Sequence, residues 1–381
     1  MEMTRAKSVR LQSLDALRGF DMFFIMGGET LIVALAALFG FPEFEKSFGH
    51  VPWHGLNFMD TVFPLFLFLA GVSFPFSAAK SRERGLSPGA IGLRALKRGL
   101  VLFAFGLAYN GFLRNLDFAH FRVWSVLGRI GLAWMAAAWI YLALGVRSRI
   151  AVAAAILVGV TLLTRFVIAP DAAALASSLG DVASAADPFS AVGNLGCWLD
   201  RTLSAGHCYN NSPVFDPEGF AGILPAVVTA MLGMFAGDLL RREGRSGGRK
   251  TADLLFLGAG LAALGGAWSF AFPINKALWS PSFTLVVGGY SALMLALFHW
   301  AIDVRGWTRG AFFFKVIGMN SITVYMLQSV VDMNGATKFF LGGLADALGP
   351  ALGAVILSCG YIALCWFALW FLYRKQTFLK V

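Results

Sequence analysis

Charged residues are scarce in this chain, and their scarcity excludes a soluble globular domain. Asp, Glu, Lys and Arg make up 14% of the 381 residues, whereas a typical soluble domain carries about 25%. Hydrophobic residues make up 58%, and they gather in runs of about 20 residues, the length that crosses a bilayer as a helix. The composition therefore predicts an all-α polytopic membrane protein.

Cysteine and histidine are also rare, and their spacing excludes the usual zinc sites. The chain has four cysteines and five histidines, and none has the spacing of zinc ligands, so we expect no metal. Cys359 and Cys365 fall in an apolar run, whereas Cys197 and Cys208 share a polar segment. A disulfide between the latter two is compatible with the sequence if that segment faces an oxidising compartment.

Acidic residues are fewer than basic ones, which gives the chain a net charge of +10. In a soluble protein this excess would suggest nucleic-acid binding. In a membrane protein the enrichment of Lys and Arg in cytoplasmic loops explains it, so we expect no nucleic-acid partner. A cleavable signal peptide is also not expected, because the first apolar run is too long and no small-residue cleavage site follows it.

Apolar windows predict about ten spanning helices in a single bundle. No soluble domain, linker or short repeat interrupts them, so residues 1–381 are expected to form one transmembrane domain. One polar insertion, residues 169–218, separates the fifth and sixth runs. The expected helices cover residues 17–40, 57–79, 96–113, 123–146, 149–168, 219–241, 252–272, 279–302, 312–332 and 350–373.

Basic residues predict how this bundle lies in the membrane. With ten spans, the segments richest in Lys and Arg all fall on one side, which the positive-inside rule assigns to the cytoplasm. Both termini are then cytoplasmic, and the 169–218 insertion is outside, periplasmic in a bacterium. The basic residues are Arg5, Lys7, Arg10, Lys80, Arg82, Arg84, Arg94, Lys97, Arg98, Arg147, Arg149, Arg241, Arg242, Arg245, Arg249, Lys250, Arg305, Arg309, Arg374, Lys375 and Lys380.

The polar stretch before the second run concentrates residues able to move a proton. His50, Trp53 and His54 lie in a short loop, and Asp60 follows one turn into the apolar run. Topology places this loop on the outer side. Asp60 either receives a hydrogen bond from an imidazole and fixes its tautomer, or caps the start of the helix.

The first run carries ionisable residues, which are costly at membrane depth and are therefore functional candidates. Asp15 and Arg18 lie three residues apart, on one helical face at the cytoplasmic entry. They either pair locally, or Arg18 recognises a phosphorylated ligand. Glu29, two turns beyond Asp21, is either a structural acceptor or a carboxyl that orients or deprotonates a group near His50.

Further polar residues lie near the ends of later runs. Arg122 is a candidate interface anchor, whereas Arg129 lies two turns deeper, where a bound anion or a buried carboxylate partner is expected. Asp216 and Glu218 either cap the sixth helix or line an amine-binding pocket. Other candidates are Asn275, Lys276 and Trp279 on the outer side, and Asn320 and Ser321 in the ninth run, where polar side chains often join helices.

Taken in order, several of these stretches resemble the heparan-α-glucosaminide N-acetyltransferase family and its bacterial relatives. The shared pieces span nearly the whole chain, and it is their order that makes the resemblance specific. They are residues 14–19 (LDALRG), 50–56 (HVPWHGL) leading to Asp60 and Phe63-Pro64, 122–129, 216–219 (DPEG), 275–280 (NKALWS) and 318–321 (GMNS).

The resemblance implies acetyl transfer from cytosolic acetyl-CoA to the amine of a glucosamine unit across the membrane. The family's active histidine falls on His50, whereas His54 stands where the family usually has asparagine. A family asparagine late in the first helix lines up by spacing with Glu29. On this resemblance we expect no counterpart of the large lumenal N-terminal domain of the animal enzyme. The family also suggests a homodimer, and a bacterial relative would lie in the inner membrane.

These considerations assign roles to the candidate residues. His50 is the expected general base, oriented by Glu29 or Asp60, with an acetyl-histidine intermediate as the mechanistic alternative. The residues expected to bind acetyl-CoA are Arg18, Arg129, Arg122, Arg98, Asn320 and Ser321. Those expected to bind the sugar are Trp53, His54, Asp216, Glu218, Asn275, Lys276 and Trp279.

Two other functions are compatible with the same sequence. An amino-sugar transporter would also need charged residues at the membrane midplane, usually with inverted repeats or broken helices. An O-acyltransferase of cell-envelope glycans would share most of the features above. The acceptor itself stays open between free glucosamine, a glycan fragment and another amine.

Overall fold

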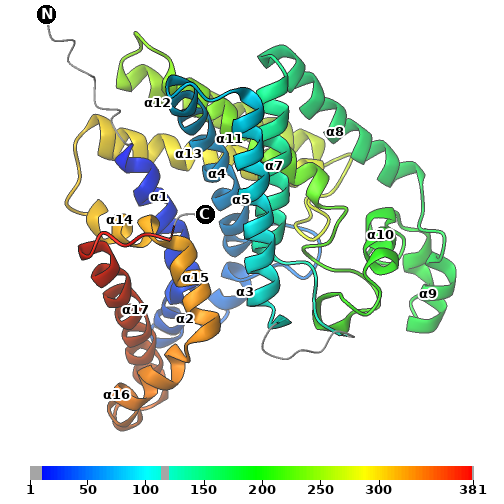
Figure 1. Ribbon diagram of the computed structural model, residues 1–381. Helices are drawn as coiled ribbons and strands as arrows, with labels where there is room; N and C mark the ends of the chain where they lie inside the picture. The colour runs from blue at the N-terminus through cyan, green and yellow to red at the C-terminus, as the bar shows by residue number, and fades with distance from the viewer. Residues whose placement is uncertain (1–10, 113–119, 380–381) are drawn as a thin grey trace, which may run out of the picture.

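A computed structural model describes residues 11–112 and 120–379 of the chain (Figure 1). Regular structure in these residues is helical apart from one isolated bridge between Ile168 and Asn194. The all-helical prediction is therefore confirmed for the described part. Arg5, Lys7, Arg10 and Lys380, used above for orientation, lie outside the described residues.

The helices follow one another with mostly short connections. Two π-helical segments, Phe24–Gly28 and His299–Val304, continue α1 and α13, and short 3₁₀ segments cover Val182–Ala186 and Tyr209–Asn211. The α-helices are α1 (Gln12–Phe23), α2 (Glu29–Leu38), α3 (Phe44–Phe48), α4 (Phe58–Glu83), α5 (Pro88–Tyr109), α7 (Val126–Ala143), α8 (Val146–Phe166), α9 (Ala172–Leu179), α10 (Leu195–Leu203), α11 (Ile223–Arg241), α12 (Gly247–Trp268), α13 (Pro281–Phe298), α14 (Ala311–Met319), α15 (Ser321–Val330), α16 (Met333–Ala347) and α17 (Pro350–Arg374).

Eight helical segments of the described chain are long and apolar enough to cross a membrane, which confirms a multi-pass membrane protein. They correspond to eight of the ten expected runs. The other two runs are α5, which carries Arg94, Lys97 and Arg98, and the α14–α15 pair. The eight are Gln12–Leu38, Phe58–Glu83, Val126–Ala143, Val146–Phe166, Ile223–Arg241, Gly247–Trp268, Pro281–Val304 and Pro350–Arg374.

Two of the expected runs are not continuous helices. The run 312–332 breaks at Asn320, whose backbone leaves the helical region at φ −131° and ψ 33°. The side chain of Asn320 donates to the carbonyl of Thr377 (3.2 Å) in the C-terminal tail. This partner cannot be predicted from the apolar run itself. The first run breaks at Gly27, where φ is +105°, a conformation that glycine adopts without a steric penalty.

The centre of the molecule is held by close helix pairs. Where α4 packs on α11, a Cβ at Gly71 would lie 2.2 Å from the carbonyl oxygen of Ala230, and one at Gly233 would lie 2.0 Å from that of Phe68. Only glycine permits this approach, as is common between membrane helices. The pair fixes the start of α4 beside the start of α11, which positions the site described next.

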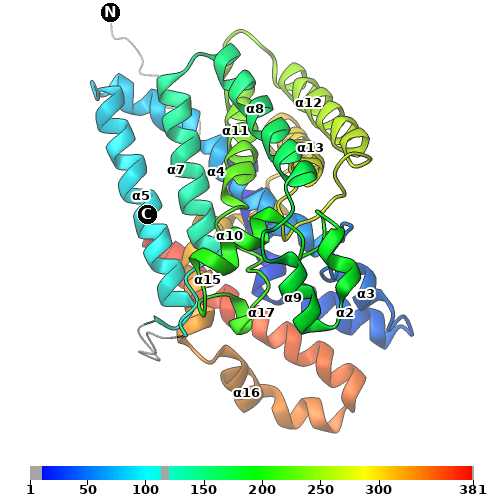
Figure 2. The ribbon, with the colours of Figure 1, turned by 90° about the vertical axis from the view of Figure 1, so that its right-hand side faces the viewer.

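The insertion 169–218 is structured and lies at the same end of the molecule as the α2–α4 connection. Figure 2 shows α9 and α10 of the insertion in the lower half of the molecule, where α2 and α3 also lie. The connections α4–α5, α7–α8 and α11–α12, which carry many of the basic residues, lie at the opposite, upper end in Figure 1. Cys197 and Cys208 in the insertion are both buried free thiols, so the structure contains no disulfide between them.

Candidate active site

The loop of residues 49–57, called the His50 loop below, ends where α4 begins. Asp60 lies in the first turn of α4 and its side chain is buried. Its Oδ2 accepts hydrogen bonds from the backbone N–H groups of Asn57 (3.1 Å) and Val51 (3.3 Å). The carboxylate thus both caps the helix and folds the loop back over it.

His50 and Asp60 form a pair, as the sequence predicts for an imidazole of this loop. The Nδ1 atom of His50 lies 2.7 Å from Oδ1 of Asp60. Lys276, more than two hundred residues further along the chain, places its Nζ 3.0 Å from the same Nδ1 and 3.3 Å from the same Oδ1. Asp60 is therefore held between an ammonium group and an imidazole.

The other imidazole nitrogen of His50 is available. The side chain of His50 is 55% exposed, and its Nε2 atom has no hydrogen-bond partner within the described part of the chain. Next to the Asp60 carboxylate, Nδ1 carries the ring proton and donates it to Oδ1, so Nε2 is left as the nitrogen that can accept a proton from a bound molecule or from water.

Lys276 belongs to a second loop that is joined to the first. The N–H of Gly55 donates to the carbonyl of Ile274 (2.8 Å), and the amide nitrogen of Asn275 lies 3.3 Å from Nδ1 of His54. Burial lowers the pKa of Lys276 and also that of His54, since both lose solvent that would stabilise the charged form. His54 thus braces the loops and stands apart from the His50–Asp60 pair.

The two tryptophans expected in the site differ in their exposure. Trp53 is half-buried, and its indole N–H donates to the carbonyl of Phe189 (2.9 Å) in the insertion. Trp279 is fully buried beneath the site, donates to Thr229 (3.0 Å) and packs its ring 4.9 Å from that of Phe63. Trp53 is therefore placed at the surface of the site, and Trp279 supports it from below.

A second charged cluster lies where the insertion returns to the bundle. Arg122 donates to both carboxylate oxygens of Asp216 (2.8 and 2.6 Å) and also to Glu218. These carboxylates raise the pKa of Arg122 further above its usual value, despite its burial. The two acids thus anchor an arginine, where the sequence left capping and ligand binding as the alternatives.

Arg129 is buried beside this cluster. Its Nη2 donates to the carbonyl of Gly219 (3.0 Å), and its guanidinium lies 5.1 Å from the ring centre of Trp279. Its Nε and Nη1 have no hydrogen-bond partner in the described residues. The charges of Glu218 and Arg129 both act on the pKa of Lys276. The Arg122 cluster and the His50–Asp60–Lys276 group therefore interact electrostatically.

Asp200, which the sequence analysis missed, completes this cluster. Its Oδ1 accepts from the N–H of Ala221 (3.1 Å), and a Cβ at Gly219 would lie 2.0 Å from its Oδ2. Burial raises the pKa of Asp200 to about 7. Its position next to Arg201 in a polar insertion gave no signal of burial, because such charged pairs are usually solvated.

Four of the six residues expected to bind acetyl-CoA surround one cavity of about 210 Å³, called the arginine cavity below. Two of them bring guanidinium groups and two bring an amide and a hydroxyl. The lining residues are Arg18, Phe66, Ala70, Arg98, Gly318, Met319, Asn320, Ser321, Ile322 and Leu379. The break at Asn320 thus opens onto this cavity, while Arg122 and Arg129 lie with the second charged cluster.

The arginines of this cavity are held from the bundle side. Arg18 forms the expected pair with Asp15 at 3.8 Å and also donates to Ser73 and to the carbonyl of Leu69. Arg98 lies 4.6 Å from the ring centre of Trp134, and its Nε lacks a hydrogen-bond partner among the described residues. A cavity lined by two such cations attracts anionic groups.

An apolar cavity of about 20 Å³ adjoins the arginine cavity and shares Phe66 and Ile322 with it. Its wall also includes Phe63, whose ring meets that of Trp279 under the active site. The remaining wall residues are Met22, Ile25, Val126, Leu127, Ile130 and Tyr325. Apolar side chains thus connect the arginine cavity with the floor of the His50 site.

Glu29 lies near the His50 loop without joining the pair. A Cβ added to Gly49 would lie 3.9 Å from Oε1 of Glu29, whereas the polar groups next to the His50 ring in the described residues belong to Asp60 and Lys276. The orienting role of Glu29 therefore stays a prediction. The described residues contain no group of three or more His, Cys, Asp or Glu placed to hold a metal ion.

No protein-family model matches the chain. Its sequence is 26% identical to human heparan-α-glucosaminide N-acetyltransferase over 420 residues, which cover 98% of this chain and 60% of the human protein. The mouse protein of the same name is 24% identical over 425 residues, covering 100% of this chain and 62% of its own length. The chain thus spans about three fifths of these relatives. It is a distant homologue of theirs at the family level.

Proposed function

We propose that this protein is a transmembrane acetyltransferase that moves acetyl from cytosolic acetyl-CoA to the amine of a glucosamine-type sugar on the opposite side. The distant homology to heparan-α-glucosaminide N-acetyltransferases supports a membrane acyltransferase. The observation that carries the proposal is the open Nε2 of His50, backed at Nδ1 by the buried carboxylate of Asp60.

His50 acts as the general base in this proposal. An amine must lose a proton before it attacks a thioester, and a positioned imidazole that accepts it contributes about 10² to 10⁴ in rate. The Asp60 carboxylate stabilises the imidazolium that forms. Lys276, 3.0 Å from His50, is placed to stabilise negative charge that develops on the thioester oxygen.

The arginine cavity is the proposed site for the phosphates of acetyl-CoA. Arg18 and Arg98 supply the positive charge, and Asn320 and Ser321 supply polar groups at the helix break. Between this cavity and the His50 site lies the apolar cavity, which suits the uncharged arm that carries the thioester. Side-chain movement must widen that cavity for the arm to pass.

The sugar is proposed to sit over the His50 loop. Glu218 is 11% exposed and pairs with Arg122, so one face of its carboxylate is available to an ammonium or a hydroxyl of the acceptor. Trp53 supplies a flat apolar surface of the kind that sugars stack on, and His54 and Asn275 join the loops beside it. The remaining expected sugar ligands, Asp216 and Trp279, are buried and act through these neighbours.

The arrangement in the membrane follows from the loops. The connections rich in Lys and Arg lie at the end opposite the His50 loop, so by the positive-inside rule we propose that this end faces the cytoplasm and that the arginine cavity opens towards it. We propose the inner membrane of a bacterium as the location, and a homodimer as the assembly.

Release of free CoA tests the proposal directly. Purified protein with acetyl-CoA is expected to release CoA when glucosamine-type amines are added, and His50→Ala is expected to abolish this release. Lys46→Gln, an exposed lysine at the same end of the molecule, is the control that should keep full activity. Rapid-quench capture of labelled acetyl-protein without acceptor would replace direct transfer by an acetyl-histidine route.

An amino-sugar transporter is the second candidate, because two helices are broken, at Gly27 and at Asn320. Discontinuous helices are typical of transport sites. Sugar uptake into vesicles that needs no acetyl-CoA and persists in His50→Ala would favour this function over the enzyme. Acetylation of sugars that carry hydroxyls and no amine would instead indicate an O-acyltransferase.

A further inference from the structure

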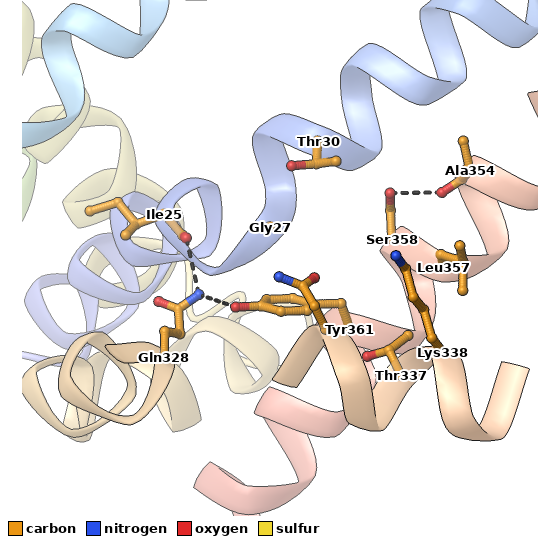
Figure 3. A pocket seen from close by; sticks show the side chains of 11 residues that line it. Ile25, Gly27, Thr30, Gln328, Thr337, Lys338, Ala354, Leu357, Ser358 and Tyr361 are labelled. Carbon is orange, nitrogen blue, oxygen red and sulfur yellow. Dashed lines mark hydrogen bonds between the residues drawn. The ribbon is translucent and has the colours of Figure 1, made fainter. Parts of the chain in front are cut away.

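A further cavity lies away from the His50 loop and the arginine cavity, and it shares Ile25 with the apolar cavity. It has a volume of about 390 Å³, within the range of small-molecule sites. It is enclosed by the break in the first helix and by α15, α16 and α17 (Figure 3). The lining residues are Ile25, Gly27, Thr30, Gln328, Asn334, Thr337, Lys338, Ala354, Leu357, Ser358 and Tyr361.

The break at Gly27 brings polar groups to one part of the cavity wall, which is otherwise mostly apolar. Irregular backbone at membrane depth is tolerated where it is buried in protein or lines a polar cavity. Here Gln328 uses its amide nitrogen to donate to the freed carbonyl of Ile25 (3.3 Å) and to the hydroxyl of Tyr361 (2.8 Å). Figure 3 shows these three residues at one side of the cavity.

The charge of the lining is positive. Lys338 is its charged residue, and no carboxylate lines the cavity. Its ammonium reaches towards Ser358 in Figure 3. Within the described chain Lys338 has no ion pair, and neither Thr30 nor Asn334 has a side-chain hydrogen bond. All three side chains are exposed, so these donors from two helices can meet a ligand with several anionic oxygens.

The helix that carries Lys338 is apolar on its outer side. The neighbouring Phe339 and Phe340 are 85% and 70% exposed, and Leu344 on the next turn is 52% exposed. An exposed apolar patch of this kind is typical of a surface that meets a membrane or another apolar partner. The unused donors thus lie next to a surface that accommodates acyl chains.

We propose that this cavity binds the phosphate headgroup of an anionic membrane phospholipid. The headgroup phosphate accepts hydrogen bonds from Lys338, Thr30 and Asn334, while the acyl chains lie along Phe339 and Phe340. The site is separate from the His50 loop and from the arginine cavity, and it does not depend on the proposed acetyl transfer.

Thermal unfolding of the delipidated full-length protein in neutral detergent tests this site. Phosphatidylglycerol is expected to raise Tm by about 2 to 5 °C at saturation, and phosphatidylcholine by less than half as much. Lys338→Gln should remove most of the difference, since it keeps the length of the side chain and loses its charge. Lys46→Gln, another exposed lysine at this end of the molecule, should keep it.

The contrary outcomes are equally specific. An equal shift in Lys338→Gln and Lys46→Gln, or an equal shift with both lipids, overturns the site. An equal shift with glycerol 3-phosphate overturns the lipid as its ligand, because a soluble phosphate then suffices. If Lys338→Gln does not fold, native mass spectrometry of the unaltered protein from mixed micelles decides, and retention of both lipids in equal amounts contradicts the proposal.

Discussion

His50 and Asp60 meet at 2.7 Å although the loop that carries the histidine is otherwise open to solvent. The carboxylate is fixed from behind by two backbone N–H groups, so it cannot turn away from the imidazole without unmaking the start of α4. A half-exposed base is thereby given one orientation. The first prediction follows from this rigidity.

Asp60→Asn is expected to lower kcat for acetyl transfer by about 10² to 10⁴, because the amide no longer stabilises the imidazolium or selects its tautomer. CoA release at saturating substrates measures the effect. Glu29→Gln is the matched comparison, and we expect it to keep most of the activity. The reverse ranking would assign the orienting role to Glu29.

Lys276 provides a prediction about pH. Burial lowers its pKa, so its ammonium loses the proton at a lower pH than an ordinary lysine, and activity that needs the charge declines on the alkaline side. Lys276→Arg keeps the charge to higher pH, so the alkaline decline of kcat/KM should move upwards in that variant. An unchanged alkaline limb in Lys276→Arg would show that the charge of Lys276 is not required.

Substitutions in the arginine cavity are expected to weaken the binding of acetyl-CoA and to leave the binding of the sugar unchanged. Arg18→Gln and Arg98→Gln should each raise KM for acetyl-CoA about tenfold or more, by removing a charge worth about 1.5 to 3 kcal/mol to a bound phosphate. The KM for the sugar should stay near its original value. Arg94→Gln, on the exposed side of the same helix as Arg98, is the control. Equal losses in all three variants would argue against a phosphate site here.

Asp200 predicts how stability depends on pH. Its pKa is raised to about 7 in the folded protein, so between roughly pH 4 and 7 the folded state holds a proton that the unfolded state has released. Stability therefore falls as pH rises through this window. Asp200→Asn should flatten the dependence, which Tm measured from pH 4 to 8 would show. A parallel fall in both proteins would place the titrating group elsewhere.

The helical class was predicted from the length of the apolar runs. The sequence also singled out His50 and Asp60, which meet at the start of α4, because polar residues beside an apolar run are conspicuous. It did not predict the breaks at Gly27 and Asn320. The length of an apolar run does not show whether its helix is continuous. The break at Asn320 also depends on the carbonyl of Thr377, which lies at the far end of the chain.

Pairings across long separations were equally hidden. Lys276 was expected near the sugar, but nothing in its neighbourhood indicated a place between His50 and Asp60. Arg122 and Arg129 were grouped with Arg18 by charge, whereas the fold separates them into two sites. Asp200 gave no signal, because its burial depends on how the insertion folds back on the turn at Gly219.

The narrowness of the apolar cavity has an electrical consequence. At about 20 Å³ it has room for about one water molecule, and its side chains offer no row of hydrogen-bond partners along which protons could hop. An apolar constriction of this kind blocks ions by dewetting. If the protein has the proposed function, it would therefore leave the membrane potential intact while acetyl-CoA is absent, and the thioester arm would be the part of the ligand that passes this constriction.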